Sequence, residues 1–203
     1  MHDTQVESAC ARRGCAARFG SPQRAKDRTT FTWQPSQERT GTNVHAVCEQ
    51  AAGHREEKYV QVSACEALAR IAEGTPESAA QMVEEGMIGL VKQAMEAHPE
   101  EKYVHVSACE ALARIAEGAR ESAVQMVEEG MIGLVKHAMQ AHPEEKQVQG
   151  RACDALTGIA LGGPECAAQM VEEGMIGLIK QAMEVHPEEK QVQGRACDAL
   201  TGI

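Results

Sequence analysis

Three kinds of chemically active side chain recur along the chain at one fixed spacing of 44 residues. Histidine and cysteine bind transition metals, the two together can form a nucleophile and its base, and a row of carboxylates attracts cations. The three series are His54, His98, His142 and His186; Cys65, Cys109, Cys153 and Cys197; and Glu66, Glu110, Asp154 and Asp198.

The equal spacing argues against a metal site or a catalytic centre. It places like residues on successive units of the chain rather than around one point, so the cysteines are expected to be buried, reduced thiols. The histidines lie at the junction of the second and third helices, where three of the four precede proline, and are expected to end the second helix. His105 and His137 occur in one unit each, and the sequence contains no phosphate-binding loop or nucleophile–base signature. We therefore expect no enzyme, no cofactor and no metal.

The acidic series allows two interpretations. The four carboxylates could form a ladder for an extended basic peptide, because neighbouring helices lie roughly 10 Å apart, close to three residues of extended chain. Alternatively they belong to a solvated helix face, where Glu66–Arg70 and Glu110–Arg114 are ordinary pairs four residues apart. Tyr59 and Tyr103 are the aromatic residues of the repeats and are further candidates for partner binding.

The elements that must position these residues are helices of a tandem repeat. Residues 75–118 recur, lightly altered, at 119–162 and 163–203, and a fixed period of this size is typical of stacked repeats. Each full unit is predicted to contain three helices. In the second unit these run over 76–85, 87–98 and 99–117, with Gly86 ending the first and Pro99 opening the third.

The ends of the array are less regular. Residues 43–74 are predicted to form a partial unit that begins with a helix over 43–53, and residues 1–42 a mostly disordered tail. The last unit, 163–203, leaves a helix with no following repeat, which favours either a missing continuation or self-association through this uncapped helix. Its apolar residues are Val192, Ala196, Leu200 and Ile203.

Composition narrows the partners. The chain of 203 residues has a formal net charge of −10, which disfavours nucleic acid and anionic membrane as partners and favours basic segments of other proteins. Aromatic residues make up only 2%, so the repeat core must consist of Leu, Ile, Val, Met, Ala and Cys. The N-terminus lacks the apolar core of a secretory signal, and the cytoplasm is the expected location.

The repeat resembles the armadillo family. The resemblance lies in Gly86-Met87-Ile88-Gly89-Leu90-Val91 and in ACEALARI at 108–115, which match the opening of the second armadillo helix and the centre of the third. The variant is similar to the armadillo regions of leucine-rich-repeat kinases and of many unicellular-eukaryote proteins. It implies an all-α, right-handed superhelix over 43–203. Peptide-binding armadillo proteins carry Trp and Asn where this chain has Glu110 and Arg114, so binding of nuclear localisation signals is not expected.

These observations predict a non-catalytic scaffold for protein–protein interactions, with an acidic concave face suited to basic segments. Two alternatives stay open: a regulatory repeat region of a larger multidomain protein such as a kinase, and a recently expanded array without a settled partner. Residues 142–159 and 186–203 are identical, which recent duplication explains without any function.

Overall fold

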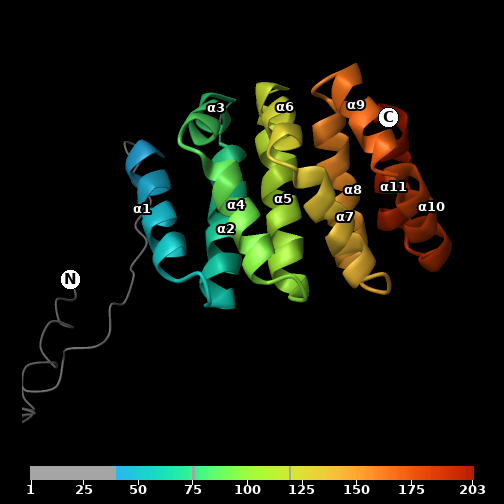
Figure 1. Ribbon diagram of the computed structural model, residues 1–203, viewed down its shortest axis with the longest axis horizontal. Coiled ribbons are helices and arrows are strands. Elements are labelled where there is room, and N and C mark those ends of the chain that lie inside the picture. Colours follow the sequence, from blue (N-terminus) through green and yellow to red (C-terminus); the bar gives the residue numbers. More distant parts are fainter. Residues whose placement is uncertain (1–39, 75, 119) are drawn as a thin grey trace, which may run out of the picture. The chain divides into compact units, whose positions relative to one another are not determined.

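The computed structural model describes residues 40–74, 76–118 and 120–203, all within the compact unit Gln37–Ile203. These residues form helices joined by short turns, and no strand occurs among them (Figure 1). The prediction of a disordered tail over 1–42 falls, up to residue 39, outside the described residues. The helices are α1 (Thr40–Gly53), α2 (Lys58–Ala72), α3 (Pro76–Glu84), α4 (Met87–Ala97), α5 (Lys102–Gly118), α6 (Arg120–Glu128), α7 (Met131–Ala141), α8 (Lys146–Ala160), α9 (Pro164–Glu172), α10 (Met175–Val185) and α11 (Lys190–Gly202).

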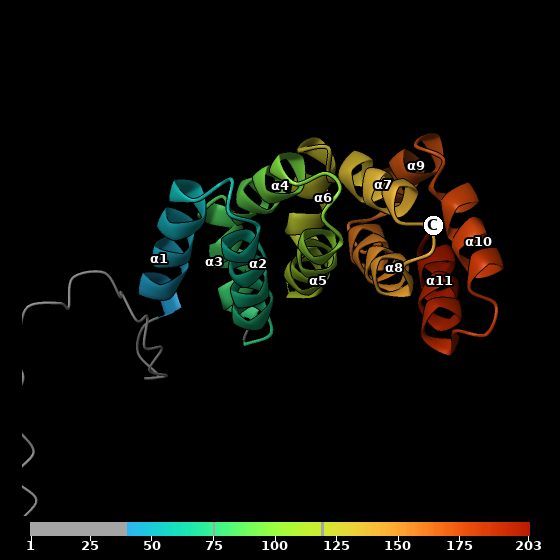
Figure 2. The ribbon, with the colours of Figure 1, turned by 90° about the horizontal axis from the view of Figure 1, so that it is seen from below.

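The three-helix unit predicted from the sequence is confirmed. Helices α3–α5, α6–α8 and α9–α11 are its three copies, and α1 and α2 supply the second and third helices of the partial first unit. The third helices α2, α5, α8 and α11 lie side by side in one layer, and the second helices lie in the other (Figure 2). The first helices of the units cross the upper end of the array in the view of Figure 1.

The turn between the first and second helix depends on glycine. Gly86 adopts a left-handed conformation with φ 75°, and its equivalents Gly130 and Gly174 have φ 77° and 79°. A side chain at this φ would be strained, whereas glycine adopts it at little cost. The amide of Gly86 donates to the carbonyl of Val83 at 3.0 Å, so the first helix ends here as predicted.

The predicted start of the third helix was wrong. It begins at Lys102 rather than at Pro99, because residues 98–101 form a turn in which the amide of Glu101 donates to the carbonyl of His98 at 3.2 Å. In the next unit Glu145, the residue before the helix, is extended at φ −92° and ψ 94°. The glutamates after proline therefore lie before the helix, and the carbonyl of Glu101 accepts the amides of Val104 and His105 at 3.0 and 3.2 Å.

The core is aliphatic and continuous from unit to unit. Its large, fully buried side chains are leucine, isoleucine and methionine, among them the equivalent residues Met82, Met126 and Met170. Small residues let the third helices approach closely: a Cβ on Gly158 of α8 would lie 2.8 Å from the Cβ of Ala116 of α5. Close packing of this kind holds the third helices in a fixed register, and that register decides which surface residues line up.

Candidate protein-binding face

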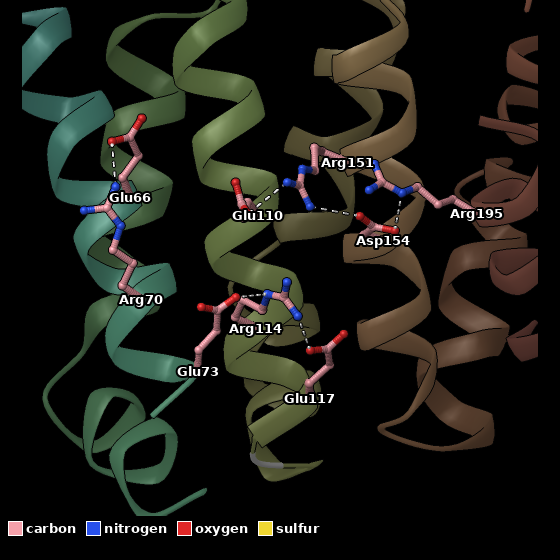
Figure 3. Close-up of polar contacts among 9 residues, drawn as sticks. All are labelled: Glu66, Arg70, Glu73, Glu110, Arg114, Glu117, Arg151, Asp154 and Arg195. Atoms are coloured by element: carbon pink, nitrogen blue, oxygen red, sulfur yellow. Dashed lines mark hydrogen bonds and ion pairs between the residues drawn. The ribbon is translucent and has the colours of Figure 1, made fainter. Parts of the chain in front are cut away.

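The exposed side of α2, α5, α8 and α11 carries the predicted site residues. We call this side the third-helix face. Because the four helices lie side by side, residues 44 positions apart in the sequence occupy equivalent places on neighbouring helices (Figure 2). The acidic series therefore does form a row across the face, but its members differ in their surroundings (Figure 3).

In the first unit the row has the arrangement expected of a solvated helix face. Glu66 lies 3.9 Å from Arg70, one turn further along α2; the side chain of Arg70 is largely exposed and that of Glu66 is about half exposed. Such a pair contributes little, since water screens the two charges and the side chains lose rotamer freedom. Glu66 is thus accessible to a partner.

In the second unit the structure does not form the expected ion pair between Glu110 and Arg114. Arg114 instead contacts Glu73, at the end of the neighbouring α2, at 3.0 Å and Glu117 of its own helix at 3.1 Å. Close packing of α2 against α5 brings Glu73 within reach, and two carboxylates satisfy a guanidinium better than one. Arg114 therefore joins two repeat units and is less available to a partner than Arg70.

Glu110 and Asp154 belong to a chain of ion pairs that crosses three units. Arg151 of α8 contacts Glu110 of α5 at 2.9 Å and Asp154 of its own helix at 3.4 Å, and Arg195 of α11 contacts Asp154 at 3.2 Å (Figure 3). Burial raises the pKa of the Asp154 carboxyl, while the charges of Arg195 and Arg151 act in the opposite direction. The middle of the acidic row is thus neutralised by the protein itself. Asp198, exposed on α11, has no ion pair with a described residue.

Sequence reasoning missed Arg151 and Arg195. The available signal was a paired change in the third helix: Val106-Ser107 of the second unit becomes Gly150-Arg151 in the third. A Cβ on Gly150 would lie 3.0 Å from Nη1 of Arg195, so the glycine leaves room for the arginine of the following unit. Gly150 therefore acts together with Arg195 of the next unit rather than with Arg151 beside it.

An open groove of about 590 Å³ lies between the beginnings of α8 and α11. Its walls carry charges of both signs, and most of the cations are already paired within the protein, as Lys146 is with Glu189 at 2.8 Å. The groove shares Arg151 and Arg195 with the chain of ion pairs on the third-helix face. Its lining residues are Val106, Lys146, Gln147, Arg151, Glu188, Glu189, Lys190, Gln191, Val192 and Arg195.

Tyr59 and Tyr103 are the most exposed large apolar side chains among those described, at 75% and 60%. Each lies beneath the amino group of the preceding lysine, with 5.7 Å from Lys58 to the ring centre of Tyr59 and 5.4 Å from Lys102 to that of Tyr103. The same lysines reach the next unit, where Lys58 contacts Glu101 at 3.0 Å. The lysines thus hold both rings at the beginning of the third helices, at the edge of the face.

The cysteine series is buried, as predicted, except at the last unit. Cys65, Cys109 and Cys153 are free thiols inside the core, and burial raises the pKa of each to about 12. Cys197, the fourth member, is exposed on α11. Within residues 40–74, 76–118 and 120–203, no group of three or more His, Cys, Asp and Glu side chains could hold a metal ion. No helix of the same residues is both long enough and apolar enough to span a bilayer.

The predicted apolar stripe of α11 is only partly open. Val192 and Ala196 are buried, because they point toward the helices of their own and the preceding unit, whereas Leu200 and Ile203 are half-buried. Of the four apolar residues on this helix, only Leu200 and Ile203 are therefore partly accessible.

A known family matches this arrangement of repeats. The family described as LRRK2 ARM repeat matches residues 44–203, most of the chain. The chain belongs to the LRRK2 ARM repeat family. No curated protein matches this ARM repeat chain.

Solved structures agree with the ARM repeat fold. An engineered protein has a TM-score of 0.70 at 23% identity over 79% of this chain and 62% of that chain. A second engineered protein has a TM-score of 0.68 at 25% identity, covering 78% and 37%. A designed armadillo repeat protein in complex with the peptide (KR)4 has a TM-score of 0.68 at 21% identity, covering 79% and 64%. The chain therefore spans less than two thirds of the length of these proteins, and the likeness establishes its armadillo-type, all-α solenoid fold.

Proposed function

We propose that this ARM repeat chain is a non-catalytic scaffold that binds segments of other proteins along its third-helix face. The observation that carries the proposal is the register of α2, α5, α8 and α11, which places side chains 44 residues apart at equivalent positions across one face. A regular face of this kind can present the same contact to every few residues of an extended partner.

We further propose that the preferred segments are basic, with the first unit and the end of the array as the places of strongest attraction. Glu66 is about half exposed and only weakly paired, and Asp198 is exposed without an ion pair among the described residues. Glu110 and Asp154 already hold Arg151 and Arg195, so a basic segment would have to displace these arginines to use them. A designed armadillo protein that binds the alternating peptide (KR)4 provides a precedent on the same fold.

The test is fluorescence polarisation of a labelled alternating Lys-Arg octapeptide with the full chain at low and high salt. The informative variant combines Glu66→Gln with Asp198→Asn, and we expect it to weaken binding about fivefold at low salt, where surface charges act most strongly. Reversing all four acidic residues is a poorer test, because it also strips Arg151 and Arg195 of their partners.

The matched control combines Glu100→Gln with Glu144→Gln. Both glutamates are exposed in the turns before third helices, so the control removes equal charge from outside these helices. Equal weakening in variant and control would mean that only net charge matters. Binding that is unaffected by salt and by both variants would refute the preference for basic segments.

A second proposal is that the repeats form the regulatory region of a larger multidomain protein such as a kinase. The description of the family favours it, since that description names the ARM repeat of LRRK2. Sequencing the full-length transcript tests it directly, because an open reading frame that encodes a further domain would support it and a stop codon after Ile203 would refute it.

Two further expectations remain proposals. Free thiols in the core suit a reducing compartment, which supports a cytoplasmic location that a fluorescent fusion can test. Self-association would use Leu200 and Ile203 at the end of α11, and sedimentation of the full chain would detect it.

A further inference from the structure

A glutamine in the third helix joins two helices of each unit in three of the four units. Gln149 of α8 donates to the carbonyl oxygens of Met139 at 2.8 Å and His142 at 2.9 Å, at the end of α7. Gln61 makes the equivalent bonds at 2.9 and 2.9 Å, and Gln193 at 2.8 and 3.0 Å. We call this arrangement the glutamine clamp.

In the third and fourth units the glutamine clamp supplies a donor that the backbone lacks, whereas in the first unit the carbonyl of Ala51 also accepts the amide of His54 at 3.3 Å. The carbonyl of Met139 would normally accept from the amide four residues later, but residue 143 is proline and has no N–H. The Gln149 amide takes that place from a side chain that is itself buried. The end of the second helix is thereby fixed to the start of the third.

The second unit has histidine in place of the clamp. His105 occupies the position of Gln61, Gln149 and Gln193, and its side chain is only 1% exposed. Its Nδ1 atom is buried without a hydrogen-bond partner in the part of the chain that the structure describes. Residue 99 is proline here as well, so the carbonyl of Met95 has lost both its backbone donor and the glutamine.

A second contact, between units, is also absent at this place. His98 joins its unit to the preceding one through Nε2 and the carbonyl of Arg55 at 2.8 Å, and His186 does so through the carbonyl of Pro143 at 2.9 Å. The equivalent atom of His142, Nε2, is buried without a partner among the described residues. The ring of His142 instead lies 5.2 Å from that of His105, measured between ring centres.

His137 completes the group, with its ring centre 6.3 Å from that of His105. The three rings come from α5, from α7 and from the turn after α7, so they span the junction between the unit of residues 75–118 and the unit of residues 119–162. We call His105, His137 and His142 the histidine cluster. It stands where the other units have hydrogen bonds between uncharged groups.

We propose that the histidine cluster makes this junction a pH-sensitive joint, closed while His105 is neutral and opened when His105 takes up a proton. A proton on His105 would place a charge in an apolar interior beside two other imidazoles. Glu101, one turn before His105, holds Lys58, and Glu145, whose charge interacts with His142, holds Lys102. The neighbouring His98 is bonded to the carbonyl of Arg55. None of these groups therefore supplies a free anion to His105.

The direction of the pH effect follows from the burial of His105. Burial lowers the pKa of His105 from its usual 6.5 to about 4, with smaller contributions from His142 and His137. In the opened state the pKa of His105 returns toward its usual value. Between about pH 6.5 and pH 4, His105 therefore binds a proton in the opened state but not in the closed state. Stability of the junction is therefore full above pH 7 and is lost as the pH falls. For one proton, the opened fraction should rise about twentyfold from pH 7 to pH 5.

Amide hydrogen exchange of the full chain, resolved by mass spectrometry, tests this proposal. Exchange is measured at pH 7 and pH 5 with a chelator present and is corrected for the intrinsic pH dependence of the chemistry. Residues 95–105 should become about twentyfold more exposed at pH 5. Residues 183–193 form the internal control, since they contain the equivalent turn with the glutamine clamp intact.

The variant His105→Gln provides the decisive comparison. It should fold, because glutamine occupies this position in the other three units, and far-UV circular dichroism checks that it does. We expect it to abolish the extra exposure of residues 95–105 at pH 5 while leaving residues 183–193 unchanged. An equal acid response in wild type and His105→Gln, or no greater response at 95–105 than at 183–193, would overturn the proposal.

Discussion

The glutamine clamp gives a stability prediction whose size can be worked out from the contacts. Replacing Gln149 by methionine keeps the length of the side chain and removes both hydrogen bonds. Each bond is worth about 1 kcal/mol net, so we expect the loss of both bonds to cost about 2 kcal/mol. The loss falls on the end of α7 and the beginning of α8, because the two bonds connect them.

Hydrogen exchange at neutral pH measures this loss locally, which matters because a repeat array need not unfold in one step. A loss of about 2 kcal/mol corresponds to about thirtyfold faster exchange of the protected amides in residues 135–150. Gln193→Met is the matched comparison. Its side chain is half-buried, so water can replace part of what is lost, and the effect should be clearly smaller.

The reasoning fails if Gln149→Met changes exchange in residues 135–150 less than about threefold. It fails equally if Gln193→Met has the larger effect, because burial of the clamp would then not determine its contribution.

Two further predictions concern packing and thiol reactivity. Gly158→Ala should destabilise the chain by about 1–3 kcal/mol in chemical denaturation, because the new Cβ would lie 2.8 Å from that of Ala116. Gly133→Ala is the matched control: a Cβ there meets no atom within 4 Å, so the change should stabilise the helix by up to about 1 kcal/mol. Equal effects of the two changes would contradict the packing described. Alkylation of the native protein near pH 8, read by peptide mass spectrometry, should modify Cys197 and spare its three buried equivalents, whose thiols have a pKa raised to about 12 by burial. Similar labelling of all four positions would show that the core opens readily. The three protected positions are Cys65, Cys109 and Cys153.

Most of the fold could be predicted because residues that end helices recur at fixed positions of the repeat. Gly86 and its equivalents mark where the first helix stops, and the apolar spacing repeats in register in every unit. The start of the third helix was misplaced because proline is compatible with both a helix N-terminus and a turn. Only the hydrogen bond from Glu101 to His98 distinguishes the two.

The surface was harder to predict, since its interactions run between units. Glu110 and Arg114 have the sequence spacing of a helical pair, yet each finds its partner on a neighbouring helix. The distance from Glu110 to Arg151 depends on how α5 packs against α8, which the local sequence does not specify. Small changes such as Gly150-Arg151 are visible in an alignment of the units, but their meaning emerges only from the contacts.

The position of His105 illustrates the same difficulty in the core. The sequence shows that one unit has histidine where three have glutamine, a difference that duplication and drift would also produce. The effect of this histidine depends on two contacts that the local sequence does not show. The glutamine of the other units bonds to carbonyls ten and seven residues earlier. The ring of His142 lies beside that of His105 instead of bonding to the preceding unit.

The central claim is that the third-helix face recognises segments of other proteins, and a binding footprint tests it most directly. Hydrogen exchange of the full chain is compared with and without a saturating Lys-Arg octapeptide. The account predicts that the peptide slows exchange in α2, α5, α8 and α11 and leaves α4, α7 and α10 unchanged. Protection confined to α4, α7 and α10, or binding without protection of the third helices, would contradict it.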